Sequence, residues 1–509
     1  MSLIQVTDLS FTYEGGYDPV FEHVSFQIDT DWKLGFTGRN GRGKTTFLNL
    51  LMKRYEYSGR IISSVEFEYF PFPVPDQERD TLEIIDSILG DYEQWQLKRE
   101  LSRLQVAEEV LYRPFFTLSN GERTKILLAA LFLKEDRFLL IDEPTNHLDR
   151  DARQLVGRYL SSKKGFILVS HDRKFIDDSV DHILSINKTN IEVQKGNFTS
   201  WYENKQKQDQ FEQSENERLK KGIRRLESAA RQSKEWADQV ESTKIGKKSM
   251  GREKSIDSRA YIGEKSRRMQ MRRKNLEHRQ DQAIDEKKGL LKNVEEAERL
   301  KLYPQVHHME RILSLKDVVP CFDRPVCKPV SFQLEQGQRI SLQGKNGSGK
   351  SSIIKLITGE KDFGSRMSYE GTIERASKIR ISHVSQDTSF LKGGLTEFAK
   401  ESGIEDTLFK AVLRKLDFSR EQFEKQMETY SEGQKKKVLI ARSLCEQAHL
   451  YLWDEPLNFI DVYSRIQIED LILEFQPTMV FVEHDEAFTS HVSTHRVQLE
   501  QVDFGLCNQ

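Results

Sequence analysis

A series of short motifs that occurs twice constrains the fold of this 509-residue chain more than any other feature of its sequence. Each copy begins with the pattern G-x-x-x-x-G-K-[ST], at residues 38–45 and again at residues 344–351. In the first copy an apolar strand precedes the pattern and an apolar helix follows it, which is the context of a phosphate-binding loop. A series that repeats in this way indicates two similar α/β domains in one chain.

The later members of the series keep their spacing in both copies. The serine that begins a helix precedes the aspartate at the end of an apolar strand by 23 residues in each copy. A histidine follows that aspartate by 29 residues in the first copy and by 30 in the second, so the agreement is a repeat rather than a coincidence. The corresponding pairs are Ser119 and Ser431, Asp142 and Asp454, Glu143 and Glu455, and His171 and His484.

The two phosphate-binding loops predict sites for ATP with Mg²⁺. Their glycines let backbone N–H groups turn inward around the phosphates. The lysine of each loop brings a cation to the β and γ phosphates, and the hydroxyl residue after it is offered to magnesium. The predicted nucleotide-binding residues are Gly38, Asn40, Gly41, Gly43, Lys44, Thr45 and Thr46 in the first loop, and Gly344, Asn346, Gly347, Gly349, Lys350, Ser351 and Ser352 in the second.

Acidic residues at the ends of two apolar strands predict the catalytic groups. In each pair the aspartate is placed to bind magnesium and the glutamate to activate the attacking water. Two acids at a strand end could instead cap a helix, and a single histidine is more often structural, but the strand ends of open α/β sheets are where ligands bind. The predicted catalytic residues are Glu143, Glu455, His171 and His484, and the predicted metal ligands are Thr45, Asp142, Ser351, Gln386 and Asp454.

Residues 203–303 contain no proline and repeat apolar residues at heptad spacing, which predicts two long helices that turn back near residues 241–261. Residues 218–280 hold twenty Lys and Arg against eight Asp and Glu, a net charge of +12 in a chain whose total is −2. A basic arm on an acidic body is typical of contact with nucleic acid, although a charged helical surface can also be merely solvated. The predicted RNA-contacting and tRNA-contacting residues at the tip are Lys244, Lys247, Lys248, Met250, Arg252 and Lys254.

Several classes of protein are disfavoured by composition. The longest apolar run, residues 126–133, is far shorter than the roughly 20 residues of a membrane span. The N-terminus lacks the basic start and apolar core of a signal peptide, so we expect a cytoplasmic protein. Four cysteines without C-x-x-C spacing indicate neither a disulfide framework nor a zinc site.

Residues 118–122 and residues 431–434 lie between a phosphate-binding loop and a pair of strand-end acids. In this context they resemble the signature segment of ABC ATPases. The resemblance implies an α/β fold with two tandem ABC-type P-loop ATPase domains that sandwich two nucleotides between them. Each loop would then face the signature of the other cassette. Ser431 and Gly433 would complete the first site, Ser119 and Gly121 would complete the second, and Tyr13 and Phe322 would stack on adenine.

Twin cassettes joined by a basic antiparallel α-helical hairpin are similar to the ABC-F family of translation factors over essentially the whole chain. The predicted domains are a first cassette at residues 1–202, the linker at residues 203–304 and a second cassette at residues 305–509. The resemblance implies binding to the 70S ribosome at the E site, with contact to 23S rRNA and P-site tRNA. It also implies no membrane contact and no further protein subunit, because the monomer pairs its two cassettes internally.

The second cassette is similar to the antibiotic-resistance branch of that family, since Leu457 stands where the first cassette has Thr145. That branch implies a linker that shifts P-site tRNA and dislodges lincosamides, streptogramin A and pleuromutilins from the peptidyl-transferase centre. One residue departs from the family pattern. Phe72 occupies the position of Gln386 in the first copy, so the first site is expected to lack one magnesium ligand.

Three other functions compete with this interpretation. A housekeeping ABC-F translation factor would share every motif named above. The ATPase motor of a drug exporter would leave the basic hairpin unexplained. A DNA-tethering ATPase would need far longer coils and usually a cysteine at their tip, and residues 241–261 contain none.

Overall fold

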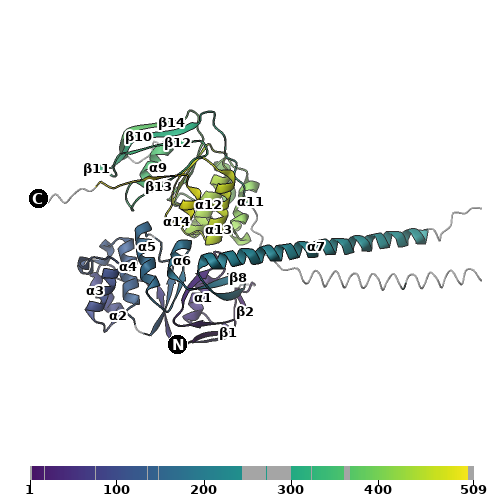
Figure 1. The fold of residues 1–509 in the computed structure, drawn as a ribbon, viewed down its shortest axis with the longest axis horizontal. Coiled ribbons are helices and arrows are strands. Elements are labelled where there is room, and N and C mark those ends of the chain that lie inside the picture. The colour runs from purple at the N-terminus through teal and green to yellow at the C-terminus, as the bar shows by residue number, and fades with distance from the viewer. Residues whose placement is uncertain are drawn as a thin grey trace, which may run out of the picture. The chain divides into compact units, whose positions relative to one another are not determined.

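The computed structural model describes residues 3–15, 18–74, 76–134, 136–146, 148–187, 189–242, 271, 300–322, 324–359 and 367–502. The chain divides into two compact units (Figure 1). One unit comprises Met1–Trp201 together with Ala297–Gln509 and contains both cassettes, and the other is Tyr202–Glu296, which belongs to the linker. The predicted tip residues Lys244, Lys247, Lys248, Met250, Arg252 and Lys254 lie outside the described residues.

A six-stranded sheet forms the centre of the first cassette. Its first five strands pair in parallel and the last is antiparallel to its neighbour. Apolar runs in which every residue is buried, such as Phe166–Val169, are typical of strands covered on both faces. Across the sheet the order is β5 (Glu66–Phe70), β6 (Arg137–Asp142), β7 (Phe166–Val169), β3 (Lys33–Thr37), β8 (His182–Asn187) and β9 (Asn190–Lys195).

A smaller antiparallel sheet packs beside it. Its order is β2 (Phe21–Asp29), β1 (Leu3–Phe11) and β4 (Ser58–Ile62). The core of the cassette joins both sheets through α1 (Lys44–Leu51), whose Phe47 packs against Phe21 and Phe36. This packing holds in place the helix that begins with Lys44, the lysine of the first phosphate-binding loop.

The remaining helices of the first cassette begin where the sequence places capping residues. Helix α4 (Asn120–Leu131) starts directly after Ser119, because Ser119 and Glu122 form a reciprocal capping box. Asp149 and Asp172 likewise accept hydrogen bonds from the first turns of α5 (Arg150–Ser161) and α6 (Arg173–Ser179). Helices α2 (Thr81–Leu89), α3 (Gln94–Arg103) and α4 gather at one end of the cassette, away from β1 and β2 (Figure 1).

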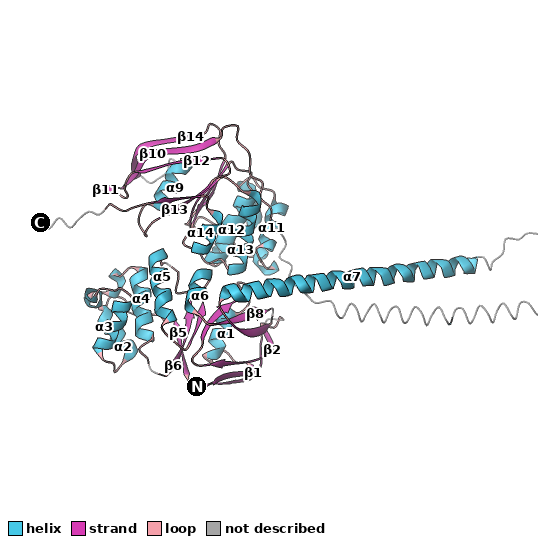
Figure 2. Cartoon of the chain, viewed as in Figure 1, coloured by secondary structure: helices cyan, strands magenta, loops and turns pink. Residues whose placement is uncertain are grey.

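The second cassette repeats this plan. Its parallel sheet has the order β15 (Ile381–Val384), β16 (Leu450–Asp454), β17 (Met479–Val482), β13 (Arg339–Gln343) and β18 (His495–Gln498). Its antiparallel sheet places β10 (Arg311–Phe322) between β12 (Val330–Glu335) and β14 (Met367–Arg375), with the short β11 (Arg324–Pro325) also pairing with β10. Figure 2 shows β10, β12 and β14 on one side of α9 (Lys350–Thr358).

The other helices of the second cassette correspond to those of the first. Ser431 caps α12 (Glu432–Cys445) in the same reciprocal box with Gln434 that Ser119 forms with Glu122. The set is completed by α10 (Leu395–Glu401), α11 (Asp406–Lys415), α13 (Val462–Phe475) and α14 (Glu486–Val492). Fully buried Phe409, Trp453 and Phe481 belong to one core that joins these helices to the parallel sheet.

Helix α7 (Phe198–Ser242) extends over 45 residues and begins directly after the first cassette. Phe198 and Trp201 in its first turn are buried, and the ring of Trp201 packs edge-on against Tyr463 of the second cassette. The start of the helix is therefore anchored in the two-cassette body. The predicted turn near residues 241–261 and nearly all of the second predicted helix lie outside the described residues. The antiparallel hairpin therefore stays a prediction.

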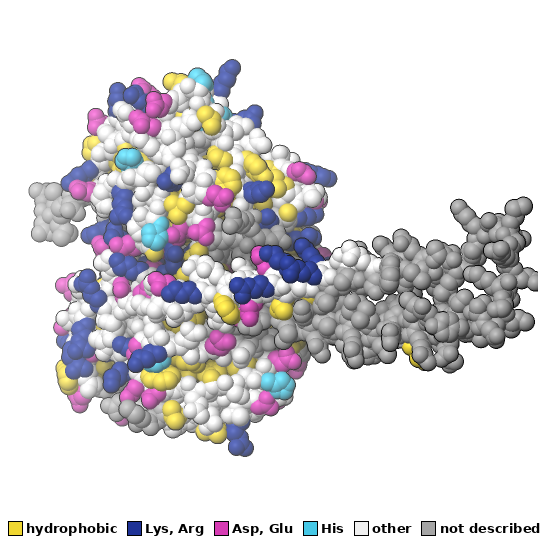
Figure 3. Space-filling view, turned by 45° about the vertical axis from the view of Figure 1, so that its right-hand side comes forward, with side chains coloured by type: hydrophobic (Ala, Val, Ile, Leu, Met, Phe, Trp, Pro, Cys, Tyr) yellow, Lys and Arg dark blue, Asp and Glu magenta, His cyan; other side chains and the backbone are white. Residues whose placement is uncertain are grey.

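The surface of the two-cassette body mixes charges of both signs (Figure 3). None of the described helices combines the length and apolar character needed to cross a membrane. Cys321, Cys327 and Cys445 are free thiols.

Candidate nucleotide sites

The first phosphate-binding loop curls around the ammonium group of Lys44. This buried group donates hydrogen bonds to Gly38 O at 2.7 Å, to Arg39 O at 3.2 Å and to Asn40 Oδ1 at 3.3 Å. Gly43 has a φ of +93°. A Cβ there would lie 2.5 Å from Val20 Cγ1, so only glycine fits. Burial lowers the pKa of Lys44.

The second loop has the same construction. Lys350 Nζ donates to Gly344 O at 2.8 Å and to Lys345 O at 2.9 Å. Gly349, at φ +85°, begins α9 as Gly43 begins α1. Both loops therefore point a lysine and a helix N-terminus into the same space, which is the arrangement that binds phosphate groups.

The predicted magnesium ligands meet beside each loop. In the first cassette Thr45 Oγ1 donates to Asp142 Oδ2 at 3.2 Å. In the second, Ser351 bonds to Asp454, and Asp454 Oδ1 is buried without a hydrogen-bond partner in the structure. Burial raises the pKa of Asp454 to about 6. A buried carboxylate oxygen without a donor fits a cation, so these hydroxyl and carboxylate groups are suited to Mg²⁺, which would neutralise phosphate charge when bound.

The predicted catalytic groups adopt matching positions in the two cassettes. His171 Nε2 lies 3.3 Å from Glu143 Oε1, and His484 Nε2 lies 3.3 Å from Glu455 Oε1. Both glutamates follow directly after a central strand, β6 or β16, and both have positive φ angles, +51° and +49°. This shared backbone turn aims each carboxylate toward its histidine.

The charge states of the two glutamates differ. Burial, with the neighbouring Asp142 carboxylate, raises the pKa of Glu143 to about 8. Burial also acts to raise the pKa of Glu455, but hydrogen bonding from His484 and its charge outweigh burial, so that this pKa is lowered. Gln386 Nε2 and Asn458 Nδ2 donate to Glu455 Oε2 at 2.9 and 2.7 Å. The second glutamate is therefore the better stabilised as a carboxylate.

Each of two pockets takes its lining from both cassettes. The first joins the loop, acids and histidine of the first cassette to the signature of the second, and the other does the reverse. The predicted residues that line the first pocket are Asn40, Gly41, Lys44, Thr45, Asp142, Glu143, His171, Ser431 and Gly433. Those that line the second are Ser119, Gly121, Phe322, Asn346, Gly347, Gly349, Lys350, Ser351, Ser352, Gln386, Glu455 and His484.

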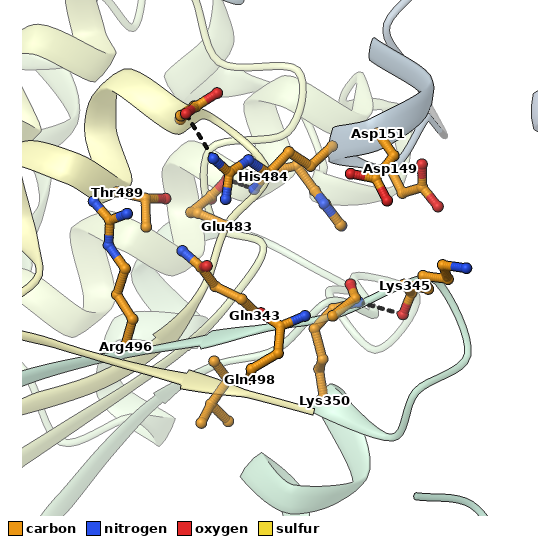
Figure 4. A pocket seen from close by; sticks show the side chains of 14 residues that line it. Asp149, Asp151, Gln343, Lys345, Lys350, Glu483, His484, Thr489, Arg496 and Gln498 are labelled. Carbon is orange, nitrogen blue, oxygen red and sulfur yellow. Dashed lines mark hydrogen bonds and ion pairs between the residues drawn. The ribbon is translucent and has the colours of Figure 1, made fainter. Parts of the chain in front are cut away.

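A smaller cavity adjoins the second site (Figure 4). Glu483 and His484 lie on one side of it and Lys350 on the other, with Asp149 and Asp151 of the first cassette at its edge. The loop that follows β6 in the first cassette therefore reaches the catalytic groups of the second.

The predicted adenine contacts have different surroundings. Phe322 is 44% exposed and lines the second pocket. Tyr13 is 46% exposed, but its hydroxyl lies 2.5 Å from Thr46 Oγ1 and its ring packs edge-on against Phe11 and Tyr55. Tyr13 is not among the residues that line the first pocket.

Sequence reasoning missed several groups that complete the sites. Tyr69 Oη donates to Asp142 Oδ2 at 2.9 Å, from the strand that precedes Phe72. Arg39 forms an ion pair with Asp417 across the first pocket, and Lys437 pairs with Asp461 at 3.2 Å within the second cassette. A position-by-position comparison of the two copies would have marked only Tyr69 and Asp417, whose counterparts are His383 and Gln105. Arg39, Lys437 and Asp461 have counterparts of the same charge, which are Lys345, Lys125 and Asp149.

Comparison with known families agrees with this geometry. A family model described as ABC transporter matches residues 21–146 and 327–458. The chain belongs to this family of ATP-binding cassette proteins, and it is an ATP hydrolase.

Relatives align over nearly the whole chain. "Ribosome protection protein VmlR" of Bacillus subtilis is 25% identical over 501 residues, covering 97% of this chain and 86% of that protein. "Erythromycin resistance ATP-binding protein MsrA" of Staphylococcus epidermidis is 27% identical, with 92% of each chain covered. "Energy-dependent translational throttle protein EttA" of Haemophilus influenzae is 24% identical, covering 94% and 88%. These relatives support placement among ABC-F ATPases.

Solved structures share the twin-cassette fold. An archaeal ribosome recycling factor, aABCE1, in complex with the ribosomal stalk protein aP1, superposes with a TM-score of 0.60 at 17% identity, covering 97% of this chain and 90% of that chain. A ribosome-bound archaeal ABCE1 gives a TM-score of 0.58 at 18% identity, with 97% and 78% covered. This likeness establishes the fold alone.

Proposed function

We propose that this chain is a ribosome-bound ABC-F ATPase that occupies the E site in its ATP form. Its linker shifts P-site tRNA and thereby dislodges lincosamides, streptogramin A and pleuromutilins from the peptidyl-transferase centre. Glu143 and Glu455 act as the bases that activate water, and His171 and His484 contact the γ-phosphate. The tip residues from Lys244 to Lys254 contact RNA.

The observation that carries the proposal is the shared lining of the two pockets. Ser431 and Gly433 line the same pocket as Lys44, and Ser119 and Gly121 line the same pocket as Lys350. This shared lining supports a γ-phosphate that bridges the two cassettes. Its loss on hydrolysis removes that bridge, so the nucleotide state controls how firmly the cassettes hold each other. A linker that starts in one cassette and returns to the other is moved by the same event.

The charge of the linker supports RNA as its target. In the described part of α7, Arg218, Lys220, Lys221, Arg224 and Arg225 are exposed and follow one another within eight residues. A run of exposed side chains of one sign on a helix is attracted to the phosphate backbone. The surface of the two-cassette body, where both signs are mixed, offers no comparable stripe on the face shown in Figure 3.

The names of relatives indicate where such an ATPase acts. VmlR is called a ribosome protection protein, MsrA an erythromycin resistance protein and EttA a translational throttle. The replacement of Thr145 by Leu457 in the second cassette favours the resistance activity. A housekeeping translation factor is the second candidate, because EttA aligns over almost the same share of the chain.

The double variant Glu143→Gln with Glu455→Gln tests the mechanism. It should bind ATP, lose at least about 100-fold in turnover because general-base catalysis is removed, and accumulate on 70S ribosomes in co-sedimentation. Lys44→Ala with Lys350→Ala is the matched control, since it removes nucleotide binding and should not accumulate. Ribosome binding that is the same for both proteins, with or without ATP, would contradict the proposal.

A drug-susceptibility panel separates the candidate functions. A sensitive bacterium that expresses the chain should tolerate the three drug classes named above with unchanged drug accumulation. Removal of residues 244–254 should abolish this protection while ATP hydrolysis persists. Protection by the shortened chain would contradict a role for the tip. Reduced drug accumulation in cells that express the full chain would indicate an exporter. No protection by the full chain would favour the housekeeping factor.

A further inference from the structure

Two corresponding positions hold different residues in the two cassettes. In both cassettes the residues at these positions connect the loop after the catalytic glutamate to the segment that carries the catalytic histidine. In the first cassette Thr145 Oγ1 lies 3.2 Å from Ser170 Oγ, which connects the loop after Glu143 to the residue before His171. In the second cassette the corresponding residues are Leu457 and Glu483. The leucine cannot donate from its side chain, so another contact must connect the loops.

Glu483 supplies that contact with both of its carboxylate oxygens. Oε1 accepts a hydrogen bond from the backbone N–H of Leu457 at 2.8 Å, and Oε2 accepts one from the backbone N–H of His484 at 3.2 Å. Glu483 is 8% exposed, and the Leu457 side chain is fully buried in the core of the cassette. A buried carboxylate therefore bridges the loop that carries Glu455 to the residue that carries the catalytic imidazole.

We propose that Glu483 is a positioning residue for ATP hydrolysis at the second site, where it holds the imidazole of His484 against Glu455. It acts through these two groups and needs no contact of its own with the nucleotide. The exchange of Thr and Ser for Leu and Glu replaces one connection between the loops by another, because Glu483 Oε1 accepts from the Leu457 N–H where the first cassette has the contact between the Thr145 and Ser170 hydroxyls. This inference rests on ATP hydrolysis and not on ribosome binding.

The groups around Glu483 hold it within a buried network beside the catalytic pair. Burial raises the pKa of Glu483, Arg465 and the Leu457 N–H oppose that rise, and Glu455 and Asp485 add to it. The guanidinium of Arg465 is itself held by Asp485 Oδ2 at 3.1 Å and by the carbonyl oxygens of Ile460 and Leu457, so it stabilises the same loop. The carboxylate, the arginine and the two backbone N–H groups form one buried network beneath the catalytic pair.

The test uses the full chain with Glu143→Gln, so that the remaining turnover comes from the second site. In this background Glu483→Ser should lower kcat at least tenfold with KM changed less than threefold, because the nucleotide contacts stay and only the catalytic pair is displaced. Leu457→Thr with Glu483→Ser restores the hydroxyl pair of the first cassette and should return kcat to within threefold. Glu483→Gln, which keeps one acceptor, should fall between the two.

The control is Glu446→Gln, a carboxylate of the same cassette that accepts a hydrogen bond from Ser382 away from the pockets. It should leave kcat within twofold. Thermal unfolding of each variant identifies any that fails to fold, and then the double variant carries the test. A kcat unchanged in Glu483→Ser, or a folded double variant no faster than that single variant, would overturn the proposal.

Discussion

The guanidinium of Arg39 in the first phosphate-binding loop forms an ion pair with Asp417, which belongs to the other cassette. Arg39 also lies over the ring of Tyr463 at 5.8 Å. The next loop residue, Asn40, donates to Phe459 O at 3.1 Å. At the second site the corresponding positions hold Lys345 and Gln105, which cannot form an ion pair. The first pocket thus has a charged contact between cassettes that the second lacks.

Asp417→Asn should weaken nucleotide retention at the first site. Both members of the pair are largely buried, with 18% and 27% of their side chains exposed, so the contact is worth about 1 kcal/mol and its loss about a fivefold faster nucleotide release. Release of a fluorescent ATP analogue would be followed in a Lys350→Ala background. Gln105→Asn is the matched control at the other site, and equal rates for both variants would contradict a role for the pair.

Tyr69→Phe should raise the Mg²⁺ concentration that the first site needs. The hydroxyl of Tyr69 fixes Asp142 Oδ2, and a hydrogen bond to a charged group contributes about 1.5–3 kcal/mol. We expect the half-saturating Mg²⁺ for nucleotide binding to increase about tenfold in the Lys350→Ala background. His383→Phe is the control, because His383 lies at the same strand position of the second cassette. An unchanged Mg²⁺ requirement would show that Tyr69 is dispensable.

Gly433→Ala should disturb the fold where Gly121→Ala does not. A Cβ on Gly433 would lie 2.6 Å from the backbone oxygen of Phe459, whereas a Cβ on Gly121 would meet Leu148 Cδ2 at an ordinary 3.6 Å. Overpacking against backbone costs about 1–3 kcal/mol, so only the Gly433 variant should lose that much stability in denaturant titration. Equal losses in the two variants would refute the steric argument.

Glu483→Gln should change how stability depends on pH. Burial raises the pKa of Glu483 to about 7, with Arg465 and the Leu457 N–H opposing the rise and Glu455 and Asp485 adding to it. The folded protein therefore keeps a proton that the unfolded chain releases, and the stability contributed by Glu483 falls as pH rises from about 4.5 to about 7. The loss amounts to roughly 3 kcal/mol.

The glutamine variant lacks this titration, so its stability relative to the parent chain should improve across the same pH range. Urea unfolding at pH 4.5, 6 and 8 measures the difference. Glu446→Gln serves as the control, and a difference between Glu483→Gln and the parent that does not vary with pH would exclude a buried, proton-linked Glu483.

The motifs predicted the local machinery well because each is a contiguous segment whose backbone geometry follows from its own residues. Lys44 and Lys350 lie in glycine-rich loops before helices, and Glu143 and Glu455 lie at strand ends, as the sequence indicates. Tyr69 was not predicted because its hydrogen bond to Asp142 depends on the register between β5 and β6, which no local sequence pattern reveals. The pairing of Arg39 with Asp417 joins residues 378 positions apart, so only the folded structure could reveal it.

The exchange of Thr145 and Ser170 for Leu457 and Glu483 has a consequence for how the two halves can diverge. In the sequence a helix and a strand separate the members of each pair, α5 and β7 in the first cassette and α13 and β17 in the second. No single substitution therefore converts one pairing into the other. Either first step leaves a buried hydroxyl or carboxylate beside an unsuited neighbour. The two halves of this gene can therefore accumulate differences more easily than they can exchange segments. A recombinant that copies one of these loops without the other would lose the matched contact between the loop after the catalytic glutamate and the residue before the catalytic histidine.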